Sequence, residues 1–417
     1  MNDLPNLNEL TRVSARVGIL SFGGPAAQIA LMHKEFVADR SWISEKDFLR
    51  ALSFCMLLPG PEAMQLATYI GWHLHGIRGG IVAGTLFVLP GACVILLLAG
   101  LYVTYGSVPP VQSAFLGIKA TVVVIVAQAL LSLSQKTLTS CLTWALATLS
   151  FTALFLFSVP FPLVVITAGC IGVIFARDTT SDLAAKPTTS AVRIALIGGA
   201  LWLAPLLIVS LLQISILVQI GTFFATLAVV SFGGAYAVLA YMTQEVVTGF
   251  GWIATDQMID ALGLAETTPG PLILVTQFVA FLAGFADSGW TTAALAAAMA
   301  LWMTFVPCFV WIFLGAPYLE WISSRPRLSG ALTGISAAVV GVILNVGLWF
   351  AFHVVFDQRL SIALGPISAV MPDIGSVNTT ASLFLVISSL LLLRFGVSVP
   401  KSLALMALLG ASIGLIP

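Results

Sequence analysis

The sequence predicts an all-α polytopic membrane protein made of two inverted-topology repeats with broken or re-entrant helices. Three observations lead to this prediction. The composition is far more apolar than that of soluble proteins, a set of motifs recurs about 210 residues further along, and basic residues change sides between the two copies. Most of the chain is therefore expected to lie in a lipid bilayer as helices.

The composition supports the first part of this prediction. Hydrophobic residues make up 59% of the 417 residues, only 8% are charged, and the mean hydropathy is +1.07. Soluble domains carry about 25% charged residues. Residues 194–244 contain no charge and are long enough for two passes. The N-terminus, MNDLPNLNELTRVSAR, has acids and a proline but no apolar core, so we expect no cleaved signal peptide.

The same composition excludes several function classes. The net charge is zero without a basic and aromatic patch, so nucleic acid is not an expected partner. No HExxH or GxxxxGK[ST] motif occurs, and no paired nucleophile and base is evident in the apolar segments, so we expect no enzyme. The five cysteines form no CxxC, and His73 and His75 do not share a helical face, so we expect no metal and no cofactor.

An internal repeat supports the second part. Residues 21–61 match residues 231–271 at 16 of 41 positions without a gap, and the shared motifs include SFGG and PGP. Further along the offset becomes 217, where Pro90 matches Pro307. We therefore divide the chain into a first repeat at 1–176, a linker with an extra spanning helix at 177–213, and a second repeat at 214–417. Duplicated units in a membrane are typical of transporters.

Basic residues indicate that the repeats are inverted. The loop at 34–50 carries four basic residues, whereas its counterpart at 244–260 carries none. The bias reverses between 102–110, which is uncharged, and its counterpart at 319–329, which holds two arginines. Because basic residues collect on the cytoplasmic side, matching loops are expected on opposite sides of the membrane.

The charge pattern also bears on four segments that contain helix breakers: 11–38, 47–75, 215–247 and 257–285. Each is either a re-entrant hairpin or an ordinary kinked span. With hairpins, the loop positions are consistent with nine spans and four hairpins, and the crossing at 194–212 inverts the second repeat. Irregular backbone is tolerated at membrane depth when it is buried in protein or lines a watery cavity.

The breakers themselves suggest a binding site. A helix that starts inside the protein offers unpaired N–H groups and about half a positive charge to an anion, and glycine lets a ligand approach the backbone closely. The alternative is that glycine and proline only let helices cross closely. Our candidate substrate-binding residues at the breaks are Ser21, Gly23, Gly24, Gly60, Gln65, Ser231, Gly233, Gly234 and Gly270.

Charges within apolar segments add three candidates. Lys119 lies about 13 Å from the end of its apolar run and is too deep to reach water easily. It is either a cation that faces the anion or a lysine paired with a carbonyl or an acid. Glu62 follows the first PGP motif and Glu266 precedes the second. A bound anion favours the protonated form of a carboxyl group, so both are proton-coupling candidates. Glu62 can equally complement a helix dipole.

These motifs carry a resemblance to a known family. SFGGPAAQIALMHKEFV, LPGP and GIRGGIVAGTLFVLPG in the first half, with SFGGAYAVL and TTPGPLILVTQFVAFLAG in the second, resemble the long, two-domain form of the chromate transporter family. The resemblance covers nearly the whole chain. It implies a multi-pass protein of the cell inner membrane that exports chromate and confers chromate resistance.

Energetics is compatible with export. A dianion that leaves an inside-negative cell gains about 4.6 kcal/mol per 100 mV, so membrane potential alone is a sufficient driving force and proton coupling is optional. Chromate and sulfate share charge and tetrahedral shape. A transporter or channel for another anion such as sulfate therefore remains an alternative, and a homodimer is left open.

Overall fold

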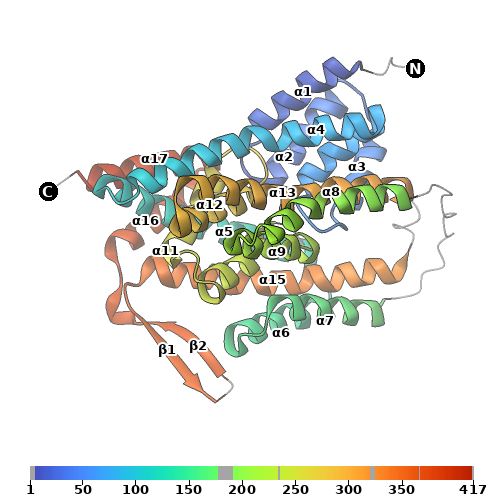
Figure 1. Cartoon of the computed structure of the whole chain (residues 1–417). Coiled ribbons are helices and arrows are strands. Elements are labelled where there is room, and N and C mark those ends of the chain that lie inside the picture. The colour runs from blue at the N-terminus through green and yellow to red at the C-terminus, as the bar shows by residue number, and fades with distance from the viewer. Residues whose placement is uncertain (1–4, 177–190, 233–234, 320–324, 366, 416–417) are drawn as a thin grey trace. The chain divides into compact units, whose positions relative to one another are not determined.

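The protein is almost entirely helical in its computed structural model (Figure 1), which describes residues 5–176, 191–232, 235–319, 325–365 and 367–415. The first half contains α1 (Leu7–Leu20), α2 (Gly24–Met32), η1 (His33–Ala38), α3 (Glu45–Cys55), α4 (Glu62–Tyr105), α5 (Pro109–Thr137), α6 (Cys141–Phe157) and α7 (Phe161–Ile174). The remainder contains α8 (Val192–Leu211), α9 (Ser215–Val230), α10 (Ala235–Thr243), η2 (Gln244–Gly249), α11 (Thr255–Thr267), η3 (Leu272–Leu274), α12 (Val275–Ser288), α13 (Trp290–Gly315), η4 (Ala316–Tyr318), α15 (Pro326–Val355), η5 (Ile374–Ser376), α16 (Thr379–Ser389), η6 (Leu390–Arg394) and α17 (Val399–Ile413).

Two strands were not expected. β1 (Arg359–Leu364) and β2 (Ile367–Pro372) form an antiparallel hairpin that follows α15 and pairs Arg359 with Pro372 (Figure 1). With this small addition, the predicted all-α fold class is confirmed.

Several helices suit a bilayer. Within the described residues, five helical segments are long and apolar enough to cross one: Glu62–Tyr105, Pro109–Thr137, Val192–Leu211, Trp290–Tyr318 and Arg327–Val355. Six further apolar helices have 10–17 residues. The protein is a multi-pass membrane protein, whereas the inversion of its repeats remains a prediction.

The longest helix, α4, is two helices joined at a sharp turn. His75 (φ −137°, ψ 24°) and Gly76 (φ 61°, ψ −153°) are not helical. The two arms pack closely on each other, because a Cβ on Gly71 would lie 2.3 Å from Gly79 O and one on Gly79 would lie 2.2 Å from Gly71 O. The first, shorter arm of α4, which follows the first PGP motif, therefore packs against the second arm of the same helix.

The corresponding region of the second half has the same design. α12 ends at Gly289, whose φ of 77° allows the chain to turn directly into α13. A Cβ on Gly284 would lie 2.7 Å from Thr292 O, so α12 and α13 are also in close contact. Small residues permit this approach in membrane helices.

The chain divides into two compact units. Unit 1 comprises residues 1–100, 179–238 and 268–325, and unit 2 comprises residues 101–178, 239–267 and 326–417. Each unit contains segments of both predicted repeats. The repeats are therefore intertwined rather than folded as separate bodies.

Each unit has its own core. In unit 1, α13 packs against α12, α9 and α8. In unit 2, α15 packs against α5, α6 and α7, and Figure 1 shows α6 and α7 (green) along it. α5 in turn packs against α11, α16 and α17. These contacts of α5 and α11 position the charged cluster described below.

Candidate functional site

The first kind of break follows α1 and recurs after α9. Ser21 and Ser231 are buried, at 0% and 1% exposure, and neither is helical. Directly after each serine, Phe22 N donates to Leu20 O and Phe232 N donates to Val230 O, both at 2.9 Å. The same sequence motif therefore makes the same local bend twice.

The glycines of this motif are described in one half only. Gly23 (φ 86°) and Gly24 (φ 75°) both adopt left-handed backbone, which a residue with a side chain rarely does. α2 then begins at Gly24 with Pro25 in its first turn, where no N–H is needed. Gly233 and Gly234 lie outside the described residues.

The second kind of break is the PGP turn. Residues 59–61 join α3 to α4, and residues 269–271 join α11 to η3 and α12. All six residues are buried. Gly60 (φ 115°) and Gly270 (φ 88°) have positive φ, which explains why glycine stands between the prolines.

The two kinds of break bind each other across the halves, within unit 1. Gly60 N donates to Ser231 O at 3.1 Å, and Gly270 N donates to Ser21 O at 2.9 Å. Gln28 reinforces the second pair, because its Nε2 donates to Gly270 O at 2.7 Å and to Ser21 O at 3.3 Å. Such a reciprocal exchange is the pattern that a twofold relation between the halves produces.

The reciprocity extends to the neighbouring long helices. A Cβ on Gly60 would lie 2.8 Å from Cys308 Sγ of α13, and a Cβ on Gly91 of α4 would lie 2.1 Å from Pro269 O. Gly91 and Cys308 are equivalent positions, since each follows one of the matched prolines 90 and 307. Each PGP turn is therefore held against the long helix of the other half.

Most polar groups at the breaks already have partners within unit 1. Besides the two glycine N–H groups, the hydroxyl of Ser21 donates to Val17 O, the hydroxyl of Ser231 donates to Ala228 O, and Gln65 Nε2 donates to Pro59 O at 2.7 Å. These groups keep the breaks in place. A ligand here would meet the first-turn N–H groups of the helices that start after residues 61 and 271, because such groups have no partner within their own helix.

Lys119 lies in unit 2 beside two acids of α11. Its Nζ is 3.3 Å from Asp260 Oδ1 and 3.5 Å from Asp256 Oδ1, and its side chain is 16% exposed. Tyr102 OH donates to the other oxygen of Asp260, Oδ2, at 2.8 Å. Of the two alternatives left open for Lys119, the structure shows the lysine paired with acids.

The fold of α11 explains why this cluster forms. Asp256, Asp260 and Gly263 follow a spacing of four and three residues, so they share one face of the helix. A Cβ on Gly263 would lie 2.2 Å from Ile118 Cγ2, so glycine lets α11 approach α5 next to Lys119. The Asp260 side chain is only 7% exposed, whereas that of Asp256 is 76% exposed.

The two predicted proton-coupling acids have different surroundings. Glu62 is the first residue of α4 and is partly exposed, in a position where a carboxylate complements the positive end of the helix dipole. Glu266 is buried, at 5% exposure, near the end of α11, where the dipole disfavours an anion.

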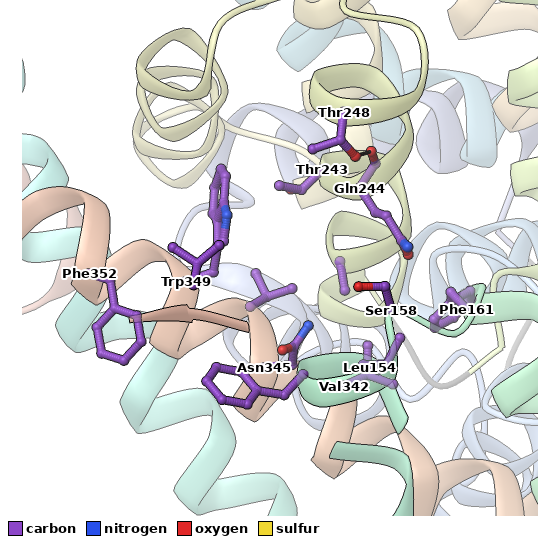
Figure 2. A pocket seen from close by; sticks show the side chains of 14 residues that line it. Leu154, Ser158, Phe161, Thr243, Gln244, Thr248, Val342, Asn345, Trp349 and Phe352 are labelled. Atoms are coloured by element: carbon purple, nitrogen blue, oxygen red, sulfur yellow. Dashed lines mark hydrogen bonds between the residues drawn. The ribbon is translucent and has the colours of Figure 1, made fainter. Parts of the chain in front are cut away.

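Unit 2 also contains a cavity of about 320 Å³. Figure 2 shows amides and hydroxyls among its walls, including Gln244, Asn345 and Ser158, and Trp349 on another side. All residues that line it are uncharged: Leu154, Phe155, Ser158, Phe161, Ala240, Thr243, Gln244, Thr248, Val342, Asn345, Val346, Trp349, Phe352 and Val370. Next to it, the ring of His353 lies 4.2 Å from that of Trp349.

Sequence reasoning missed Asp260 and Tyr102. In the stretch 244–260, only the absence of basic residues enters the sequence prediction, so Asp260 at its end is not a candidate. The signal that marked Lys119, a charge inside a segment expected at membrane depth, applies equally to Asp260. The cavity had no comparable signal, because its uncharged residues come from four separate stretches of the chain.

Comparison with known proteins decides the family. A family model described as chromate transporter matches residues 8–173 and 218–415. This chain belongs to the chromate transporter family. The family of the motif resemblance is thus confirmed, and the two matched ranges cover most of both halves.

Named relatives agree with this assignment. A chromate transport protein of Cupriavidus metallidurans is 30% identical over 84% of this chain and 84% of its own length. A chromate transport protein of Pseudomonas aeruginosa is 31% identical over 79% of this chain and 77% of its own length. A probable chromate transport protein of Synechococcus elongatus is 30% identical over 81% and 83%, respectively. No solved structure matches the chain.

Proposed function

We propose that this chain exports chromate from the cytoplasm across the inner membrane, is driven by membrane potential, and thereby confers chromate resistance. The observation that carries the proposal is the family match over both halves, together with relatives named as chromate transport proteins. The direction follows from charge, because an inside-negative potential favours exit of a dianion by about 4.6 kcal/mol per 100 mV.

The proposed scaffold is a duplicated unit with repeats at 1–176 and 214–417, in inverted orientation, and a linker at 177–213. Helix lengths support re-entrant segments beside the breaks. α3 has 11 residues and α11 has 13, so they extend about 16–20 Å at 1.5 Å per residue. The hydrocarbon core is about 30 Å thick. Neither helix is long enough to cross it alone.

The proposed oxyanion contacts are given for each unit by itself: the breaks in unit 1 and Lys119 in unit 2. At the breaks, the helices that start after the two PGP turns offer first-turn N–H groups and the positive ends of their dipoles. The cross-bonded residues Ser21, Ser231, Gly60 and Gly270 hold those helix starts in place. In unit 2, Lys119 offers a positive charge to the oxyanion. In the structure this charge is paired with Asp256 and Asp260.

The test is uptake of chromate, sulfate and phosphate into everted membrane vesicles that contain the protein, with and without an imposed potential. We expect chromate uptake that increases when the vesicle interior becomes positive. Vesicles without the protein are the control. If chromate uptake equals that control, the proposed function is wrong, and faster sulfate than chromate uptake would reassign the substrate.

A further inference from the structure

The strongest unexplained feature is a buried acid whose second oxygen is incompletely satisfied. Asp260 is 5% exposed, and Tyr102 satisfies its Oδ2. Its Oδ1 lies 3.3 Å from Lys119 Nζ but accepts no hydrogen bond of good geometry from any described residue. One oxygen of a buried carboxylate therefore relies on the lysine alone.

We propose that Asp260 is a proton-binding site linked to oxyanion binding at Lys119. This inference rests on the proposed function and adds a residue to it. When Asp260 is ionised, it holds Lys119. When a proton binds at Oδ1, the carboxyl group becomes neutral and Lys119 becomes available to the oxyanion. Proton and oxyanion then bind together and cross together.

The geometry makes the two partners of Lys119 unequal. Asp260 is buried, so the interaction between its charge and the lysine is only weakly screened. Asp256 is 76% exposed, and ion pairs with exposed carboxylates contribute little. The state of Asp260, rather than that of Asp256, therefore decides whether Lys119 is free.

The other titratable groups around Asp260 come from every helix that packs on α11. α5 contributes Lys119, α15 contributes His353, which is within the electrostatic reach of Asp256, and α17 contributes Lys401, which is exposed. Tyr102 of α4 donates its hydrogen bond to Asp260. α11 itself adds Asp256 and Glu266. Of these groups, Lys119 is the partly buried cation that contacts Asp260.

Binding linkage tests the inference. The purified protein in detergent is titrated with chromate in a weakly buffered solution with a pH indicator, in the alkaline range where free chromate is fully deprotonated. We expect uptake of one proton per chromate bound, and an affinity that weakens by up to about tenfold per pH unit as the pH rises. Asp260→Asn mimics the neutral carboxyl group, so it should bind chromate without proton uptake and without pH dependence.

Matched variants identify the residue. Asp256→Asn removes the exposed partner of the same lysine and should keep proton uptake. Asp260→Glu keeps a carboxyl group at this position, so it should show the proton uptake that Asp260→Asn lacks. Gel filtration tests whether each variant is folded.

The outcomes separate the two proposals. If wild-type protein binds chromate without proton uptake, or if Asp260→Asn keeps the full uptake, the inference is overturned while chromate binding stands. If the folded wild-type protein binds no chromate and moves none in liposomes, the proposed function fails and the inference fails with it. The inference is supported if Asp260→Asn binds chromate without proton uptake while Asp256→Asn keeps the uptake.

Discussion

Removal of the Lys119 side chain should destabilise the protein as well as stop transport. In Lys119→Ala, the buried carboxylate of Asp260 keeps the hydrogen bond from Tyr102 but loses its cation. Breaking a buried ion pair from one side costs about 3–5 kcal/mol. Because the lysine is 16% exposed, we expect the lower end, about 3 kcal/mol of unfolding free energy.

A second substitution should restore most of this loss. In Lys119→Ala with Asp260→Asn, the buried charge is gone and the amide can still accept from Tyr102, so the remaining cost is about 1 kcal/mol for the lost packing of the lysine stem. Asp260→Asn is the other single variant of the double-mutant cycle, and any cost of its own adds to the coupling. The cycle should therefore give a coupling energy of at least about 2 kcal/mol, well above the 0.3–0.5 kcal/mol within which independent sites add.

The assay is unfolding in mixed micelles, followed by chromate flux in liposomes for the variants that fold. Both the single and the double variant should lose flux, because each lacks the cation proposed to contact the oxyanion. Additive free energies would refute the buried-pair argument. Restored flux in the double variant would show that Lys119 only neutralises Asp260, and unchanged flux in Lys119→Ala would remove Lys119 from the site.

Three further predictions concern the breaks and the orientation of the repeats. Gly60→Ala should cost about 2–4 kcal/mol of unfolding free energy, since it strains a φ of 115°, overlaps Cys308 Sγ and weakens a cross-half hydrogen bond; equal stability by micelle unfolding would contradict this. Gln28→Ala should cost about 1–3 kcal/mol of unfolding free energy, because it removes the side-chain donor to the buried carbonyl group of Gly270, and should lower chromate flux in vesicles; unchanged stability and flux would show that the Gln28 bridge is dispensable. In a background without the native cysteines, Ser44→Cys should react with an impermeant thiol reagent from the cytoplasmic side and Ala254→Cys from the opposite side; labelling of both from one side would show parallel repeats.

Comparison of the two halves identified the breaks but not their partners. Matching positions 210 residues apart indicates that Gly60 and Gly270, or Ser21 and Ser231, are equivalent. It does not indicate which residues touch. The structure shows that the glycine of each PGP turn bonds the serine of the other half, an exchange that depends on the packing of four distant segments.

The free-energy cost of a charge at membrane depth identified Lys119 but not its partner, Asp260. A deep lysine requires either a ligand or an acid, and the sequence offered both alternatives. The acid on α11 could have been found by the same argument, since Asp260 also lies in 257–285, which is expected as a re-entrant hairpin or a kinked span. Its contact with Lys119 depends on Gly263, where the absence of a side chain lets two helices approach, and this effect of tertiary packing has no sequence pattern of its own.

The hairpin of β1 and β2 was missed for a different reason. Residues 359–372 are a short apolar stretch around Gly365, whose φ is 59°. In a chain this hydrophobic, an apolar stretch is more readily assigned to a helix than to a strand, because periodicity alone does not separate the two in short runs.

The most direct test of the account is chromate accumulation in liposomes that contain the purified protein, with the potential set by a potassium gradient and a potassium ionophore. We expect chromate to accumulate when the interior is positive and to be excluded when it is negative. The driving force should be about 4.6 kcal/mol per 100 mV for the dianion alone, or about 2.3 kcal/mol if one proton accompanies it. Accumulation that does not change with the sign of the potential would contradict electrogenic chromate transport by this protein.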